Sequence, residues 1–302
     1  MLEIKAGVQR QRSRMGPLAS FCAPRYDEAL NAGAQDAMAD DVTGPAPSRL
    51  AGRAHGAVRT ALAAVADLIV PPCCLVCRAP LGAHHLLCGP CWREVRFIRP
   101  PLCDVLGIPL PFDAGERTVS AAALAAPPAY DRARAVAHFS GSMRTLVHQL
   151  KYADRHDART LLGRWLVEAS RELRPGIDMI VPVPLSRLRL LLRHFNQAAV
   201  LAGELSRATG IPMQPLLLKR TRATRSQVGM TREQRRLNVR GAFAVPRRRR
   251  AGLQGKNVLL VDDVITTGAT ANACARALKR AGAARVDVLA LAMVTNESLV
   301  AA

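Results

Sequence analysis

The chain has 302 residues, and its 43 Lys and Arg residues against 23 Asp and Glu residues give a formal net charge of +20. This charge excludes an acidic scaffold and favours anionic partners. Hydrophobic residues make up 49% of the chain and charged residues 22%, a balance that excludes disordered and collagen-like proteins. At roughly 150 residues per domain, the length predicts about two domains, each large enough to bury a core.

The first part of the chain mixes small, polar and charged residues. Residues 1–53 have neither the period of a helix nor that of a strand, so we expect a disordered tail. Over residues 57–69, apolar residues recur at helical spacing and stop at Pro71-Pro72. We therefore expect residues 54–128 to hold this helix, a cysteine-rich module and a Pro-rich linker. No internal repeat is apparent.

Strand patterns alternate with helix patterns in the rest of the chain, residues 129–302. We predict strands at residues 134–139, 179–184, 258–261 and 286–293. Helices are predicted at residues 142–152, 158–173, 196–208 and 269–281. This alternation predicts an α/β domain, in which helices flank a parallel sheet.

Neither a membrane span nor a secretion signal is expected. No run of about 18 uncharged apolar residues occurs, and the first 25 residues lack the apolar core of a signal peptide. We therefore expect a cytoplasmic protein. In a reducing compartment its eight cysteines indicate metal binding rather than disulfides. The sequence leaves open whether the chain forms a homodimer.

Two CxxC pairs lie close together in the cysteine-rich module. They are Cys74 with Cys77 and Cys88 with Cys91. Four thiolates suit tetrahedral zinc without an open position, so we predict a structural Zn²⁺ site and not a catalytic one. Alternative ligands are Cys73 in place of Cys74 and either His84 or His85 in place of one thiolate. The isolated Cys22, Cys103 and Cys274 are interpreted as incidental or core thiols.

The most informative segment joins the strand at residues 258–261 to the next helix. The strand ends in Asp262 and Asp263, and the loop residues that follow are Thr266, Thr267, Gly268, Ala269 and Thr270. Backbone N–H groups, Thr hydroxyls and the positive end of a helix together form a cradle for phosphate. Two carboxylates can accept hydrogen bonds from vicinal sugar hydroxyls. The combination indicates a sugar phosphate, whereas an ordinary N-cap would explain one polar residue.

This segment resembles the signature for 5-phosphoribosyl-1-pyrophosphate (PRPP) in type I phosphoribosyltransferases. The resemblance implies that Asp262 and Asp263 hold the ribose 2′- and 3′-hydroxyls. It also implies that the segment from Thr266 to Thr270 holds the 5′-phosphate.

A wider resemblance covers about residues 60–295. The zinc pairs and the PRPP signature, together with Leu150-Lys151-Tyr152, Val181-Pro182-Val183-Pro184-Leu185, Arg193-His194-Phe195-Asn196-Gln197, Gln227, Arg235 and Asn238, resemble the ComF (competence protein F) family. Members join a zinc-ribbon module to a phosphoribosyltransferase domain and are linked to natural transformation, the uptake of DNA. Two positions depart from the family pattern. A second pair of CxxC knuckles is reduced to Cys103, with Leu106 where its partner would lie, and His194 replaces a Gly.

The turn after the strand at residues 179–184 resembles the pyrophosphate loop of these enzymes. Its residues are Pro184, Leu185, Ser186 and Arg187. A rigid turn with exposed amides and a guanidinium suits a diphosphate oxygen, although a Pro-stiffened strand exit explains the same residues. By resemblance alone Lys151 is a phosphate contact, and a solvated lysine is the alternative.

Cations are concentrated in residues 219–250, where twelve Lys and Arg residues face a single acid, Glu233. In related transferases this position holds a mobile loop that closes over PRPP. Clustered cations also suit the backbone of single-stranded DNA, and a solvated loop is the alternative for residues 247–250. The low aromatic content, 4%, argues against a groove that stacks bases.

These features predict a phosphoribosyltransferase that displaces pyrophosphate from Mg²⁺-bound PRPP with a nitrogenous base. Asp262, Asp263 and Arg187 are the predicted catalytic residues, and no residue identifies the acceptor base. The alternative is an accessory protein of natural transformation that binds nucleic acid or a nucleotide without turnover.

Overall fold

The computed structural model describes residues 71–112, 115, 117–152, 157–186, 190–191, 195–222 and 231–295. The tail and the first helix expected from the sequence lie outside these residues, and so does Arg187.

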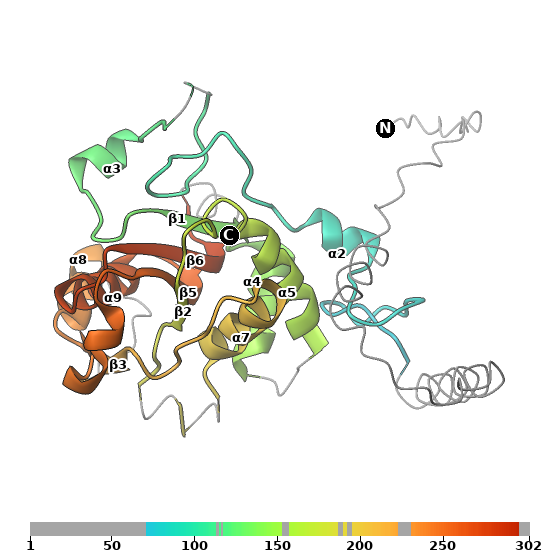
Figure 1. The fold of residues 1–302 in the computed structure, drawn as a ribbon. Helices are drawn as coiled ribbons and strands as arrows, with labels where there is room; N and C mark the ends of the chain where they lie inside the picture. Colours follow the sequence, from blue (N-terminus) through green and yellow to red (C-terminus); the bar gives the residue numbers. More distant parts are fainter. Residues whose placement is uncertain are drawn as a thin grey trace, which may run out of the picture. The chain divides into compact units, whose positions relative to one another are not determined.

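A four-stranded parallel sheet forms the centre of the described chain (Figure 1). Its strands lie in the order β1 (Ala133–His138), β6 (Arg285–Met293), β5 (Asn257–Ile265) and β2 (Met179–Pro182). All neighbouring strands pair in parallel, which confirms the predicted fold class. The strand β5 continues past its expected end at residue 261, so the two acids lie within the strand and not after it.

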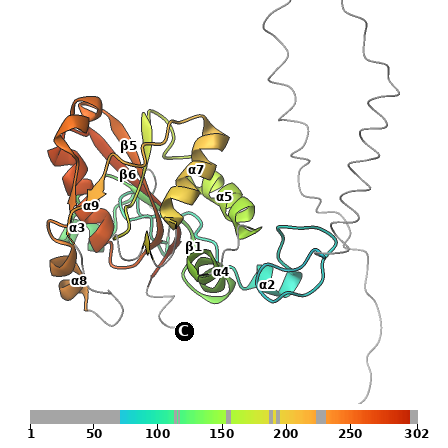
Figure 2. The same ribbon diagram turned by 90° about the horizontal axis from the view of Figure 1, so that it is seen from below.

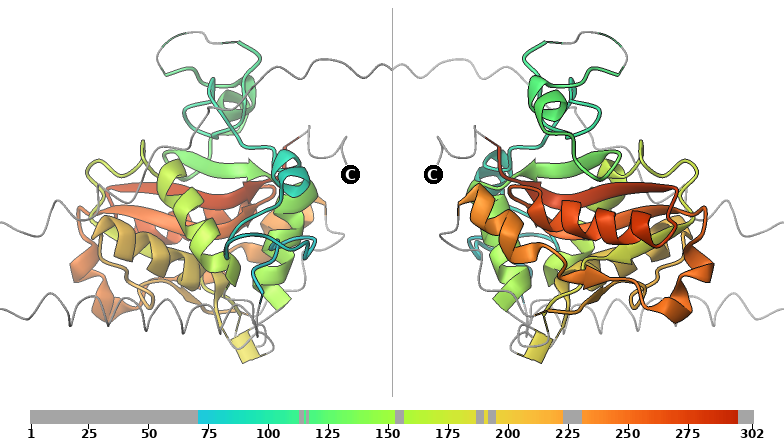
Figure 3. Two further views of the ribbon diagram at one scale, coloured as in Figure 1. Left: turned by 90° about the vertical axis from the view of Figure 1, so that its right-hand side faces the viewer. Right: turned by 90° about the vertical axis from the view of Figure 1, so that its left-hand side faces the viewer.

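Helices cover both faces of the sheet. Figure 2 shows α9 (Ala269–Arg280) on one side of the strands and α5 (Asp157–Ala169) and α7 (Gln197–Thr209) on the other. The helix α4 (Gly141–Tyr152) lies beside α5 and α7 (Figure 3). The helix α5 ends before the expected residue 173, because the chain continues in turns from Ser170. The short helix α8 (Arg232–Val239) contacts α9.

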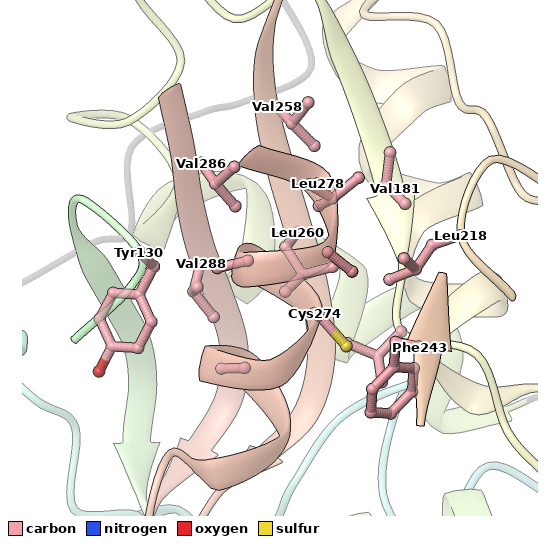
Figure 4. Close-up of a cluster of buried hydrophobic side chains, with 14 of the residues drawn as sticks. Tyr130, Val181, Leu218, Phe243, Val258, Leu260, Cys274, Leu278, Val286 and Val288 are labelled. Carbon is pink, nitrogen blue, oxygen red and sulfur yellow. The ribbon is translucent and has the colours of Figure 1, made fainter. Parts of the chain in front are cut away.

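Side chains along each strand point alternately to the two faces of the sheet, so a separate hydrophobic core lies on each face. In β5, Val258 and Leu260 pack under α9, whereas Leu259 and Val261 pack under α5 and α7. Figure 4 shows the first of these cores, where Cys274 and Leu278 of α9 face the sheet. Each fully buried aliphatic side chain contributes about 1.5–3 kcal/mol, so burial on both faces fixes the register of β5.

Smaller elements complete the described part. The two-residue strands β3 (Lys219–Arg220) and β4 (Phe243–Ala244) pair in antiparallel fashion. Short helices are α2 (Gly89–Arg93), α3 (Ala121–Ala125), η1 (Arg247–Arg249) and η2 (Ala251–Leu253). None of the helices in this part of the chain combines the length and the apolar character that crossing a membrane requires.

Both outer strands have their free edges covered. Beside β1, the N–H of Ile98 donates to the Val136 carbonyl, and the N–H of His138 donates to the Arg96 carbonyl. Beside β2, the N–H of Ile180 donates to the Pro212 carbonyl. Covered edges prevent pairing with other chains. Arg96 and Ile98, which lie between the cysteine-rich module and the Pro-rich stretch after residue 100, therefore contribute backbone hydrogen bonds to the sheet.

Candidate functional site

Four cysteine thiols come together as the CxxC spacing predicts. The Sγ atoms of Cys74, Cys77, Cys88 and Cys91 all lie within 4.8 Å of one another. A tetrahedral zinc with Zn–S bonds of about 2.3 Å places its sulfurs roughly 3.8 Å apart. Because this thiol geometry nearly matches that tetrahedron, the four side chains fit a structural Zn²⁺.

The geometry also decides between the alternative ligands. Cys73 lies outside the group of four thiols and instead accepts a hydrogen bond from Nη1 of Arg78 at 3.2 Å. His84 and His85 are exposed, and neither belongs to the group. Burial opposes ionisation of Cys74, but N–H groups of Cys88, Cys77 and Val76 outweigh it and lower the pKa of the thiol to about 6. These donors favour the thiolate that a metal requires.

The fold of the first knuckle, residues 72–81, recurs in residues 101–110. In the first, the N–H of Cys74 donates to the Ala79 carbonyl at 2.8 Å and the N–H of Arg78 donates to the Cys74 carbonyl at 3.1 Å. In the second, the N–H of Cys103 donates to the Ile108 carbonyl at 2.9 Å and that of Gly107 to the Cys103 carbonyl at 2.8 Å. Arg78 and Gly107 both have positive φ, 68° and 66°. Contrary to the sequence analysis, the chain thus contains an internal repeat.

The repeat extends to the helix that follows each knuckle. The N–H of Cys88, the N-cap of α2, donates to Sγ of Cys74 at 3.4 Å. In the second half of the repeat, which begins with the knuckle at residues 101–110, the N–H of Ser120 donates to Sγ of Cys103 at 3.3 Å. Ser120 is the N-cap of α3. The counterparts of the last three zinc ligands are therefore Leu106, Ser120 and Ala123. This second half retains one of four thiols, so these positions do not supply a zinc site.

The first half of the repeat, which begins with the knuckle at residues 72–81, contacts the α/β domain at the start of α4. Oγ of Ser142 donates to Oε2 of Glu94 at 2.8 Å. Trp92, Phe97 and Trp165 pack together with ring centroids 5.2–5.7 Å apart. The sequence did not indicate these contacts, because nothing local connects Glu94 to a serine 48 positions away.

The two predicted sugar-binding acids lie side by side near the carboxyl end of β5. Oδ1 of Asp262 accepts from the N–H of Asp263 at 2.9 Å, and Oδ1 of Asp263 accepts from the N–H of Val264 at 2.8 Å. Nζ of Lys151, from the last turn of α4, lies 2.7 Å from Oδ2 of Asp263. Burial, followed by the neighbouring charge of Asp263, raises the pKa of Asp262 well above its usual range.

The loop after β5 leads directly into α9. Gly268, the N-cap of α9, has φ 71° and provides no side-chain cap. Gly268 has no side chain that could cap the first-turn N–H groups of α9. A phosphate site uses such N–H groups as its donors. Oγ1 of Thr267 is buried and has no hydrogen-bond partner among the described residues. An orphaned hydroxyl beside an uncapped helix start fits an anionic ligand that both groups would contact.

The predicted pyrophosphate loop follows β2 but is described only in part. Pro184, Leu185 and Ser186 are partly buried, whereas Arg187 lies outside the described residues. Asn196 holds the loop in place, because its Nδ2 donates to the Val183 carbonyl at 3.0 Å while its Oδ1 caps α7. This double role, which the sequence analysis did not assign, explains why Asn196 follows the loop before an apolar helix.

A basic cluster involves arginines from two neighbouring helices. Burial, followed by the charges of Arg280 and Arg236, lowers the pKa of Arg276. Arg236 belongs to α8 and the other two to α9, two helices that contact each other. The sequence analysis placed only Arg236 in a basic segment and missed Arg276 and Arg280, which lie beyond it.

Comparisons with known proteins agree with this geometry. The family model "Double zinc ribbon domain" matches residues 65–123, and the model "Phosphoribosyl transferase domain" matches residues 196–298. A solved B. subtilis glutamine PRPP amidotransferase is 24% identical over 48% of this chain and 30% of its own, with a TM-score of 0.33. That score is too low to support the fold assignment, which rests on the family models and the sheet.

Two relatives cover most of the chain. "DNA utilization protein YhgH" of Salmonella typhi is 35% identical over 231 residues, which make up 74% of this chain and 98% of the relative. "Competence protein F" of Haemophilus influenzae is 30% identical over 72% of this chain and 96% of the relative. With a zinc-ribbon domain that precedes a phosphoribosyltransferase domain, the chain belongs to the ComF (competence protein F) family.

Proposed function

We propose that the protein is a PRPP-dependent phosphoribosyltransferase that acts in competence or DNA utilisation. The observation that carries this proposal is the neighbouring pair of carboxylates on β5, followed by the uncapped start of α9. Asp262 and Asp263 would accept hydrogen bonds from the ribose 2′- and 3′-hydroxyls. A simple phosphate site needs no such pair, so the arrangement favours a phosphorylated sugar over free phosphate.

The 5′-phosphate would bind at the loop formed by Thr266, Thr267, Gly268, Ala269 and Thr270. The orphaned hydroxyl of Thr267 and the first-turn N–H groups of α9 are the donors. Donors that are already fixed by a strand and a helix bind the phosphate with little reorganisation. The segment therefore anchors the end of the sugar that does not react.

The reacting end would lie towards the loop after β2. There the C1–O bond to the diphosphate breaks and a bond from C1 to an acceptor nitrogen forms, through an oxocarbenium-like state as in glycoside hydrolysis. Pro184, Leu185, Ser186 and Arg187 would bind the diphosphate that leaves. Mg²⁺, bound through the diphosphate and the ribose hydroxyls, would neutralise charge on that leaving group.

Calorimetric titration with PRPP in the presence of Mg²⁺ tests the proposal. We expect the wild type to bind and the double variant Asp262→Asn/Asp263→Asn to lose most of its affinity. The matched control is Asp178→Asn, because Asp178 accepts the N–H of Asn257 at the opposite end of the same strand. The proposal would be contradicted if the wild type did not bind PRPP, or if the double variant bound PRPP with the affinity of the wild type.

The acceptor base needs a separate experiment. Candidate nitrogenous bases are mixed with the protein, PRPP and Mg²⁺, and the release of pyrophosphate is measured. With any base that reacts, Arg187→Ala should lower the rate of pyrophosphate release, whereas Asp178→Asn should not. PRPP binding without turnover of any base would favour a non-catalytic nucleotide-binding role.

A second candidate function is that of an accessory protein that binds single-stranded DNA. The basic cluster Arg236, Arg276 and Arg280 favours it, because the charges of Arg280 and Arg236 act on Arg276 and a bound phosphate would reduce their repulsion. Residues 247–250 add four further arginines. This function does not require the acids of β5, so it can exist with or without the first.

Fluorescence anisotropy with a labelled single-stranded oligonucleotide tests this candidate. The affinity should fall steeply with salt, and the slope should decrease when Arg236, Arg276 and Arg280 become Gln. Replacement of residues 247–250 with Ser should decrease it further. Unchanged salt dependence in both variants would exclude the two basic regions as the DNA contact.

A further inference from the structure

Lys151 joins the last turn of α4 to the second acid of β5. Its Nζ lies 2.7 Å from Oδ2 of Asp263, and the two side chains are 19% and 18% exposed. An ion pair at this depth is screened less than one on the open surface. The sequence analysis treated Lys151 as a phosphate contact or a solvated lysine, and its contact with Asp263 indicates a different role.

The hydrogen bonds of the two acids differ in their partners. Oδ1 of each carboxylate accepts the N–H of the next residue, Asp263 or Val264. Among the described residues, the cation Lys151 lies within ion-pair distance of Asp263. Two adjacent carboxylates resist ionising together, and burial, followed by the charge of Asp263, raises the pKa of Asp262.

The support of Lys151 is rigid. Met143, Leu146 and Val147 of α4 are fully buried, and Leu150, the neighbour of Lys151, is 2% exposed. At the other end of the helix, Ser142 donates to Glu94 of the first zinc-ribbon half. Because packing fixes the helix at both ends, the side chain of Lys151 reaches Asp263 from a fixed position on the backbone.

We propose that Lys151 is a positioning residue for the sugar diol, acting through Asp263 and not through a phosphate of the ligand. This inference rests on the proposed function of the site. An ionised carboxylate accepts O–H hydrogen bonds more strongly than a neutral carboxyl group does. By holding the Asp263 carboxylate in one orientation, Lys151 prepares the acceptor that the ribose hydroxyls need.

The test compares two ligands that share the diol and the 5′-phosphate. PRPP carries a diphosphate at C1 and ribose 5-phosphate does not. Lys151→Met, which keeps the aliphatic chain and removes the ammonium, should weaken the binding of both by the same factor, about tenfold. Lys151→Arg should restore part of the affinity. A loss confined to PRPP would overturn the proposal, since it would indicate a direct contact with the diphosphate.

A double-mutant cycle separates the same two roles in another way. If Lys151 acts through Asp263, adding Lys151→Met to Asp263→Asn should weaken binding no further. Additive losses would overturn the proposal. The matched control is Lys256→Met, because Lys256 forms a similar pair with Asp178, 3.0 Å apart, at the opposite end of β5.

Failure of the function and failure of this inference give different results. A wild type that binds neither ligand would refute the proposed function and the inference with it. A wild type that binds both ligands, together with a Lys151→Met variant of equal affinity, would refute the inference alone. Thermal melting of each variant shows that affinity changes do not come from unfolding.

Discussion

The two halves of the zinc-ribbon domain fold alike but are held in different ways. Their knuckles have the same pattern of backbone hydrogen bonds, and the residues at one corresponding position, Arg78 and Gly107, both have positive φ. The first half gathers four thiols, whereas the second retains Cys103 alone among the corresponding positions. The knuckle backbone is therefore compatible with a metal but does not depend on one.

Contacts with β1 take the place of the metal in the second half. The N–H of Ala133 donates to the Val105 carbonyl at 2.9 Å. The guanidinium of Arg134 donates to the Asp104 carbonyl and lies within ion-pair distance of Asp104 and Glu172. The second half can lose its ligands because its knuckle is bonded directly to a strand. The first half contacts the α/β domain through Glu94 and Trp92, and its knuckle retains the thiols that a metal can join. Four predictions test this difference.

The largest effect is expected from a zinc ligand of the first half. Cys74→Ser should abolish zinc binding and unfold residues 71–95, because structural zinc contributes on the order of 10 kcal/mol in isolated zinc-binding peptides. Zinc content, limited proteolysis and the fluorescence of Trp92 measure the change. Cys73→Ser is the control, since Cys73 lies outside the thiol group. Zinc retained in Cys74→Ser would show that another side chain completes the site.

The next effect distinguishes the two residues of positive φ. A Cβ on Gly107 would meet the carbonyl oxygen of Ala133 inside van der Waals contact and lie 2.9 Å from its carbon. With backbone strain added, Gly107→Ala should lower the free energy of unfolding by about 3 kcal/mol. At the matched position Arg78→Gly should change it by less than about 1 kcal/mol. Urea unfolding measures both, and equal effects would contradict the close packing of the second half on β1.

A smaller loss is expected from the Arg134 contacts. The Arg134 side chain is 9% exposed, but Glu172 is 56% exposed, so solvent screens much of the attraction. Arg134→Met should therefore cost about 2 kcal/mol, mostly through the polar groups it leaves without a partner. The control Arg171→Met removes an exposed pair with Glu168 and should cost less than about 0.5 kcal/mol. Similar midpoints in urea for both variants would argue against Arg134 as a main anchor.

The sequence predicted what is local and missed what depends on the assembled fold. Strand and helix periods gave the α/β sheet, and the CxxC spacing gave the four thiols. Of the second ribbon half, the family resemblance indicated only the positions of Cys103 and Leu106. Its other two ligand positions were missed because they hold Ser120 and Ala123, which have no metal signal. The Lys151–Asp263 pair could not be predicted either, since it depends on α4 reaching the end of β5.

The smallest effect is expected at the retained thiol of the second half. Sγ of Cys103 accepts N–H groups of Leu106 and Ser120 at 3.4 and 3.3 Å, and a serine hydroxyl can accept in its place. Cys103→Ser should therefore keep the zinc content of the wild type and cost less than about 1 kcal/mol, in contrast to Cys74→Ser at the corresponding position. Cys103→Ala leaves both donors unmet and should cost about 1–2 kcal/mol. A drop in zinc content in either variant would mean that Cys103 binds metal, and the two halves would then differ less than their ligand positions indicate.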